Sequence, residues 1–144
     1  MSKRDWEADW AEADAWRAAV KEKCPLVYPY SDFQEFVGVR YGFDCPKGWR
    51  GIVEELSVQL QKYLEENPIE GFCCEQVKEK FGGLRYYVGP ADETIWDMIN
   101  VAESKSYKIC QDCGAPGETR SGGWTRTVCD ECSAEREEEK LGLC

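Results

Sequence analysis

Residues 110–132 read CQDCGAPGETRSGGWTRTVCDEC, and this stretch decides the C-terminal part of the fold. Its two C-x2-C pairs, Cys110 with Cys113 and Cys129 with Cys132, are separated by fifteen residues, a spacing typical of four-cysteine metal sites. Gly122-Gly123 lies between the pairs and permits a small hairpin. The stretch therefore predicts a ribbon over residues 108–133 that is closed at its base by a metal ion.

Four thiolates fill the coordination shell of one tetrahedral zinc ion and leave no position for water or substrate. The pattern therefore predicts one structural zinc ion. Its binding would contribute to folding, by on the order of 10 kcal/mol in comparable small sites. A redox dithiol and an iron site are the alternatives that the same spacing allows.

The chain holds nine cysteines, an odd number that fits a reducing compartment better than a secreted disulfide framework. The five outside the ribbon are predicted to be small buried residues. The alternative is a second metal site built from some of them. These five are Cys24, Cys45, Cys73, Cys74 and Cys144, of which the first four would form that second site.

The N-terminus, MSKRDWEADW, lacks the apolar segment of a secretory signal. No apolar run reaches the roughly 18 to 20 residues that span a bilayer. We therefore expect a cytoplasmic protein with no membrane partner.

Hydrophobic residues recur at helical spacing in three segments that precede the ribbon, near residues 6–22, 49–66 and 92–106. The segment 49–66 shows this spacing most clearly, and Asn67-Pro68 marks its end. The tryptophans of the first segment are predicted to face the core. Pro90-Ala91-Asp92 offers an N-cap to the third.

Residues 72–88 are β-prone on both sides of Gly82-Gly83, and this pattern predicts a hairpin with that dipeptide as its turn. A shorter alternating segment, residues 36–41, is a further candidate strand. The predicted class is α+β, with helices packed on a β-hairpin or small antiparallel sheet. The predicted organisation is a body over residues 1–107, the ribbon, and an acidic tail over 134–144 that extends a solvated helix.

The formal net charge is −10, with 28 acidic and 18 basic residues. This charge repels a phosphate backbone and disfavours broad nucleic-acid binding. It promotes solubility, or it forms an acidic face for a basic partner. The chain has no histidine, which removes most nucleophile-activation and general-base schemes, and no phosphate-binding glycine loop is present. An enzyme is therefore the less favoured interpretation.

Two local groups depart from the acidic balance. Lys78, Lys80 and Arg85 surround the predicted hairpin turn and could bind an anion, or they are ordinary solvated charges. On the ribbon, the basic and aromatic side chains could contact nucleic acid as single-strand binders do. These ribbon residues are Arg120, Trp124 and Arg126, and the alternative for Trp124 is a place in the ribbon core.

Several blocks of the chain, spread over about residues 24–133, resemble a family of small zinc-ribbon proteins encoded by bacteriophages and prophages. The resemblance implies a phage origin, a shared fold and residence in the host cytoplasm. In that family the second pair often closes with His where this chain has Cys132, and either ligand suits zinc. The blocks are YGFDC (41–45), Gly48-Trp49, QVKEKFGGLRYYV (76–88), CxxCGAPG (110–117) and GWTRTVCD (123–130).

Because that family carries no assigned mechanism, function is argued from the site. The leading hypothesis is a non-enzymatic phage accessory protein that binds a host protein and counteracts a host defence. The alternatives are a nucleic-acid-associated ribbon protein, and a small-ligand or nucleotide binder or enzyme built on the hairpin and the Tyr41 region.

Overall fold

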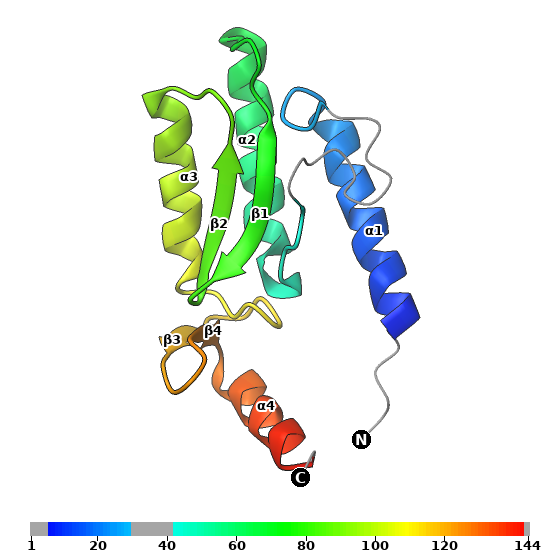
Figure 1. Ribbon diagram of the computed structural model, residues 1–144, viewed down its shortest axis with the longest axis vertical. Helices are drawn as coiled ribbons and strands as arrows, with labels where there is room; N and C mark the ends of the chain where they lie inside the picture. Colours follow the sequence, from blue (N-terminus) through cyan, green and yellow to red (C-terminus); the bar gives the residue numbers. More distant parts are fainter. Residues whose placement is uncertain (1–5, 30–41, 143–144) are drawn as a thin grey trace.

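A computed structural model of the chain describes residues 6–29 and 42–142 (Figure 1). Within them the fold is α+β, as predicted, with two separate two-stranded antiparallel sheets. None of the described helices is long and apolar enough to cross a membrane. The elements are α1 (Trp6–Lys23), a 3-10 turn (Lys47–Trp49), α2 (Arg50–Glu66), β1 (Cys74–Lys80), β2 (Gly83–Val88), α3 (Glu93–Ser106), β3 (Glu118–Arg120), β4 (Arg126–Val128) and α4 (Asp130–Gly142).

The main core lies between the β1–β2 hairpin and helices α2 and α3, which pack side by side behind it (Figure 1). The apolar residues of α2 recur every three or four positions and so form one buried face. On β2, Leu84 and Tyr86 are buried whereas Tyr87 is exposed, so its side chains alternate between the core and the solvent. The largest fully buried side chains include Trp49, Leu56, Leu60, Leu84 and Ile95.

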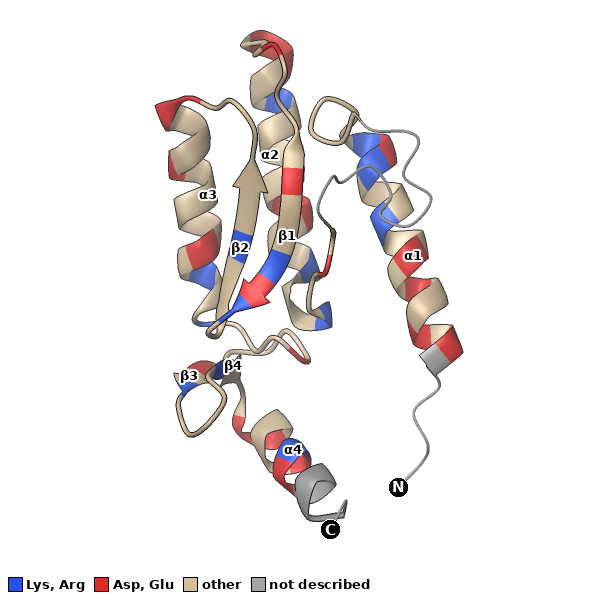
Figure 2. Cartoon of the chain, in the orientation of Figure 1, with Lys and Arg blue, Asp and Glu red and all other residues tan. Residues whose placement is uncertain are grey.

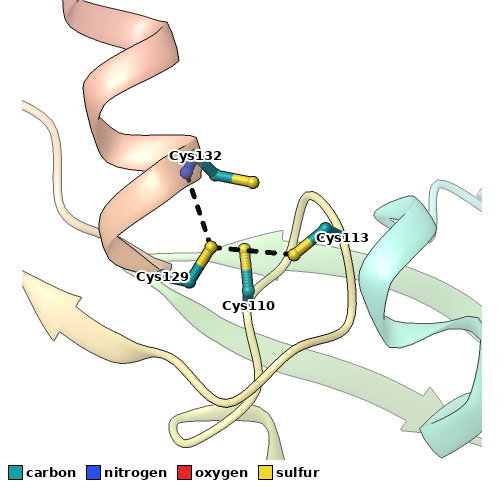
Figure 3. Close-up of side chains that lie close together, drawn as sticks. All are labelled: Cys110, Cys113, Cys129 and Cys132. Carbon is teal, nitrogen blue, oxygen red and sulfur yellow. Dashed lines mark hydrogen bonds between the residues drawn. The ribbon is translucent and has the colours of Figure 1, made fainter.

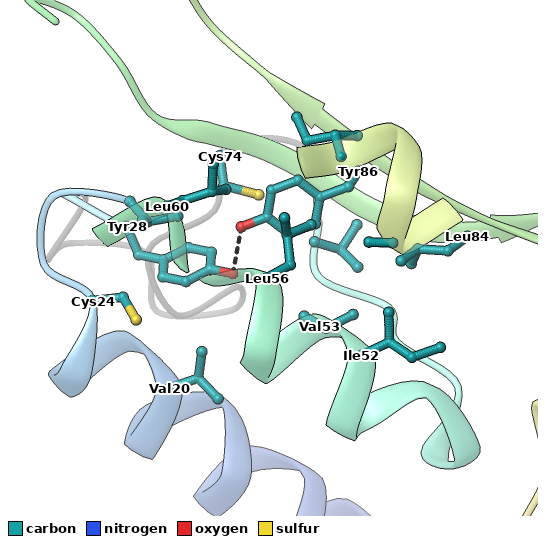
Figure 4. Packing of buried hydrophobic residues seen from close by; sticks show 14 of the residues in the cluster. Val20, Cys24, Tyr28, Ile52, Val53, Leu56, Leu60, Cys74, Leu84 and Tyr86 are labelled. Carbon is teal, nitrogen blue, oxygen red and sulfur yellow. Dashed lines mark hydrogen bonds between the residues drawn. The ribbon is translucent and has the colours of Figure 1, made fainter. Parts of the chain in front are cut away.

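A buried polar group lies inside this core. The hydroxyl of Tyr28 is 2.6 Å from Ser57 Oγ and 2.8 Å from the Tyr86 hydroxyl (Figure 4). Ser57 Oγ also donates to the Val53 carbonyl at 2.7 Å. Because every one of these hydroxyls has a partner, the core avoids the cost of an unsatisfied polar group.

Helix α1 contacts the body through apolar residues of its C-terminal half and through an ion pair of 3.0 Å between Glu12 and Arg50. Val20 and Cys24 are buried, and Trp16 packs edge-on against Phe43 with ring centroids 5.6 Å apart. Trp10, however, is 65% exposed, so the prediction that it faces the core is wrong. Helical periodicity shows which residues share a stripe, but it does not show how far along the helix the stripe is covered. The side chain of Trp6 lies outside the described residues.

The turn of the β1–β2 hairpin differs from the prediction by one residue. Lys80 pairs with Gly83, so the two turn residues are Phe81 and Gly82, with φ angles of 54° and 81°. Gly83 belongs to β2 instead. A Cβ atom on Gly83 would lie 2.3 Å from the Tyr107 hydroxyl, so glycine is required there by close packing rather than by the turn.

Three other predictions concern the candidate strand, the acidic tail and the N-cap of α3. The candidate strand at residues 36–41 lies outside the described residues. The acidic tail is helical, but α4 already begins at Asp130, so Cys132 stands in its first turn. The N-cap prediction is confirmed, since Asp92 Oδ1 accepts a hydrogen bond of 3.0 Å from the Ile95 amide.

Candidate metal centre and its surroundings

The four predicted ligands converge on one point (Figure 3). Their sulfur atoms all lie within 4.8 Å of one another. Cys110 and Cys113 come from the turn that follows α3, and Cys129 and Cys132 come from the junction of β4 with α4. Cys110 and Cys132 are buried, whereas Cys113 is exposed. The cluster is therefore anchored inside the fold and reaches the surface on one side.

The geometry fits a tetrahedral ion. Sulfur atoms bound at about 2.3 Å to one zinc ion in a tetrahedron lie about 3.8 Å apart. The Sγ atoms of Cys113 and Cys129 are 3.7 Å apart, well beyond the roughly 2 Å of a disulfide bond. The four residues can therefore hold one metal ion with little rearrangement.

Backbone amides favour the ionised thiolate form of Cys110. Burial alone raises the pKa of the Cys110 thiol, but backbone hydrogen bonds from Cys129, Cys113 and Asp112 outweigh it and lower this pKa to about 7. Burial and the neighbouring thiols raise the pKa of Cys132. Cys110 therefore has the lower pKa of the two, and binding of a cation here would require Cys132 to lose its proton.

The first pair of ligands is pressed against the body at Gly48 and Trp49. The Gly48 amide donates to the Gln111 carbonyl at 2.9 Å, and the Trp49 indole nitrogen donates to the Ile109 carbonyl at 2.8 Å. A Cβ atom on Gly48 would lie 2.0 Å from the carbonyl oxygen of Cys110. The body thus holds the backbone of this ligand pair directly.

A second set of contacts joins the ribbon to the turn of the β1–β2 hairpin. Thr127 is fully buried, and its hydroxyl donates to the Gly82 carbonyl at 2.6 Å. Gln111 and Thr127 exchange hydrogen bonds, since the Gln111 amide donates to the Thr127 carbonyl at 2.9 Å and the Thr127 amide donates to Gln111 Oε1 at 3.0 Å. Sequence reasoning missed both residues, because only their adjacency to ligand cysteines distinguished them.

The structure brings together one residue from each of the two predicted contact groups. Lys80, next to the hairpin turn, and Trp124, on the ribbon, line one surface hollow with Phe81 and Thr125. Trp124 is 71% exposed, so the alternative that it belongs to the ribbon core is wrong. Strands of three residues enclose no interior large enough for an indole, and the small core of the ribbon is formed by Val128 and the ligand cysteines.

Among the remaining members, Arg85 and Arg120 contact carboxylates, and Lys78 does not line this hollow. Arg85 forms an ion pair with Glu103 and donates to the Tyr107 hydroxyl at 3.2 Å. Arg120 donates to Asp130 at 2.7 Å. In the register of the hairpin, Lys78 lies opposite Arg85. It is two residues from Lys80 on β1.

The cysteines of the body do not form a second centre in the described part of the chain, where the ribbon cluster is the single group of three or more such ligands. Burial raises the pKa of Cys24 to about 11 and raises those of Cys45 and Cys74 further. These three thiols therefore stay protonated and weakly reactive near neutral pH. Cys24, Cys73 and Cys74 are buried, as predicted, whereas Cys45 is half-buried against the core and Cys144 lies outside the described residues.

The candidate metal centre is thus formed by four cysteines of this chain, which could bind an ion through four sulfur atoms, and the body supports it beside the turn of the β1–β2 hairpin. No protein-family model, curated protein or solved structure matches this chain.

Proposed function

We propose that this chain is a non-enzymatic, zinc-binding accessory protein of a bacteriophage and that it binds a host protein. Its resemblance to phage- and prophage-encoded ribbon proteins supports the phage origin and the host cytoplasm as its location. The role that we propose for binding this host protein is to counteract a host defence. The metal centre supports the non-enzymatic assignment, because four thiolates saturate a tetrahedral ion and leave no position for a substrate.

Zinc is the ion that this donor set favours. Four thiolates at tetrahedral separations suit zinc, and no redox change is needed for a structural role. Iron also accepts four cysteine ligands. Metal analysis of the purified chain separates the two, since a ferric tetrathiolate absorbs visible light and a zinc centre does not.

The observation that carries the binding role is an exposed apolar groove between α2 and α3. Tyr63, Met98 and Val101 line it, and Val101 is 55% exposed. Apolar side chains gathered in a surface groove mark sites of protein contact. The groove also includes Lys62 and Asp97, and charges of both signs suit a protein surface better than a phosphate backbone. We call this feature the α2–α3 groove.

A nuclease-treated pull-down from host-cell lysate tests this proposal. The metal-loaded chain is compared with Val101→Asp, which places a charge in the α2–α3 groove, and with Val58→Asp. Val58 is a matched control because it is also an exposed valine on a helix and does not line the groove. We expect one stoichiometric protein with the wild type and with Val58→Asp, and its loss with Val101→Asp. Recovery of no protein, or equal recovery with both variants, contradicts the proposal.

A further inference from the structure

The tips of the two hairpins meet and form one continuous surface. The Phe81–Gly82 turn lies against β4, where a Cβ atom on Gly82 would be 3.2 Å from the backbone of Arg126. Phe81 and Trp124 line the same hollow from these two tips, with Lys80 beside them. We call Lys80, Phe81, Trp124 and Arg126 the joined-tip surface. Its two halves are more than forty residues apart in the sequence.

Two large aromatic rings project from this surface. Phe81 is 67% exposed and Trp124 is 71% exposed. Phe81 also has a φ angle of 54°, a conformation that glycine or asparagine adopts at lower cost than phenylalanine. The backbone conformation of the turn therefore does not favour phenylalanine, and the ring contacts the neighbouring Lys80. An exposed ring in an unfavourable backbone conformation indicates a role in contact with a ligand.

The cations of this surface are available to a ligand. Among the described residues, neither Lys80 nor Arg126 forms an ion pair with a carboxylate, in contrast to Arg85 and Arg120. Figure 2 shows basic segments where the ends of β1 and β4 approach each other. Glu79 borders the hollow, but its carboxylate accepts a hydrogen bond of 2.8 Å from the Gly82 amide. Lys80 Nζ also lies over the Phe81 ring, 5.6 Å from its centroid. The surface therefore combines two cations with two exposed aromatic rings.

A second hollow continues this surface on the ribbon. It is lined by Trp124 and Arg126, which belong to the joined-tip surface, and by Arg120 and Arg136. Glu137 also borders it. Since Trp124 lines both hollows, an extended ligand can pass from one to the other along this residue.

We propose that the joined-tip surface binds single-stranded nucleic acid, with bases stacked on Phe81 and Trp124 and phosphates near Lys80 and Arg126. Aromatic platforms flanked by cations are the means by which proteins bind single strands with little sequence preference. A duplex hides the faces of its bases and cannot stack in this way. The net charge of −10 acts against binding, but salt screens charges beyond about 8 Å at physiological ionic strength, so local cations decide the contact.

Fluorescence anisotropy with a labelled oligothymidylate of about twelve nucleotides tests this inference. The full metal-loaded chain is titrated at about 50 mM salt, because few phosphate contacts are available. We expect binding of the single strand, and weaker binding of a duplex and of a free mononucleotide. Two to three cation contacts predict that log K falls with log salt at a slope of about −1.4 to −2.

Two variants that preserve the fold sharpen the test. Phe81→Asn suits the positive φ angle and so keeps the turn, while it removes the ring. Trp124→Ala removes an exposed side chain. Each is expected to weaken binding by about 5- to 150-fold. The control is Trp10→Ala, which removes an equally exposed tryptophan from α1 and should leave binding unchanged.

Several outcomes overturn the inference. The first is no anisotropy change with the single strand, and the second is a loss of binding in Trp10→Ala equal to that in the two surface variants. The third is mononucleotide binding as tight as strand binding. The fourth is that Phe81 and Trp124 bind a protein in place of nucleic acid. The inference stands apart from the α2–α3 groove. Val101→Asp should leave oligonucleotide binding intact, so failure of one proposal does not decide the other.

Discussion

A Cβ atom on Gly48 would lie 2.0 Å from the carbonyl oxygen of Cys110 and 2.7 Å from the amide nitrogen of Gly114. Both contacts are to the backbone, which cannot move aside as a flexible side chain can. Gly48 therefore permits the first pair of metal ligands to lie directly on the body. Two segments that are sixty residues apart in the chain are coupled at this point.

Gly48→Ala should destabilise the protein, by about 2 kcal/mol or more, because it forces apart two tightly packed backbones. Urea unfolding of the metal-loaded chain measures this change. Gly51→Ala is the matched control three residues later. It lies in α2 with open space around its Cβ position, so it should stabilise the fold by about 0.5 kcal/mol. Equal stability of the two variants would contradict the packing described here.

The buried hydroxyl group of Tyr28 should contribute more to the free energy of unfolding than that of Tyr86. Tyr28→Phe removes the 2.6 Å contact with Ser57 and the 2.8 Å contact with Tyr86. Tyr86→Phe removes the same 2.8 Å contact and a longer one of 3.5 Å with Ser57, and it leaves the 2.6 Å contact intact. We expect a loss of about 1 kcal/mol for Tyr86→Phe and a larger loss, up to about 3 kcal/mol, for Tyr28→Phe. Chemical denaturation gives both values. Tyr87→Phe, on the exposed face of β2, should change stability little.

Acid should remove the stabilising contact between Tyr63 and Asp92. The Tyr63 hydroxyl donates to Asp92 Oδ2 at 2.5 Å, and this bond, with that from the Ile95 amide, lowers the pKa of Asp92 below its usual value of 3.8. A lowered folded-state pKa gives a contribution that is complete above about pH 4 and is lost as the pH falls further.

Thermal melts of the wild type and Tyr63→Phe across this range check that contribution. The wild type should melt at the higher temperature at neutral pH, and the difference should shrink below about pH 4 as Asp92 takes up a proton. Taking the difference between the two proteins cancels any common effect of acid on the metal centre. A difference that is constant with pH would show that the Asp92 carboxylate plays no part.

Local patterns predicted the elements of this fold well. The helix expected at residues 49–66 is observed as Arg50–Glu66, and the four ligand cysteines meet as their spacing indicated. Both depend on residues close together in the chain, or on a motif whose spacing is set by the metal itself. The hairpin was also predicted, although its turn was displaced by one residue.

Contacts between distant segments could not be predicted in this way. A glycine at position 48 indicates a turn, but nothing in its neighbours shows that Cys110 packs above it. Gln111 and Thr127 are polar residues of ordinary type, and their mutual hydrogen bonds appear only once the ribbon is folded. For Trp124 the sequence left exposure and burial open, and burial in the ribbon core, which its apolar character suggested, is wrong because the ribbon offers no interior.

The central claim is that the ribbon cysteines hold one structural zinc ion. Metal analysis of the purified chain, with Cys113→Ala and Cys45→Ala beside it, tests this most directly, because Cys45 is a half-buried cysteine that lies outside the cluster. We predict one zinc per chain in the wild type and in Cys45→Ala, and its loss in Cys113→Ala together with a lower unfolding midpoint. Full zinc content in Cys113→Ala, or a folded wild type with no bound metal, would contradict the account.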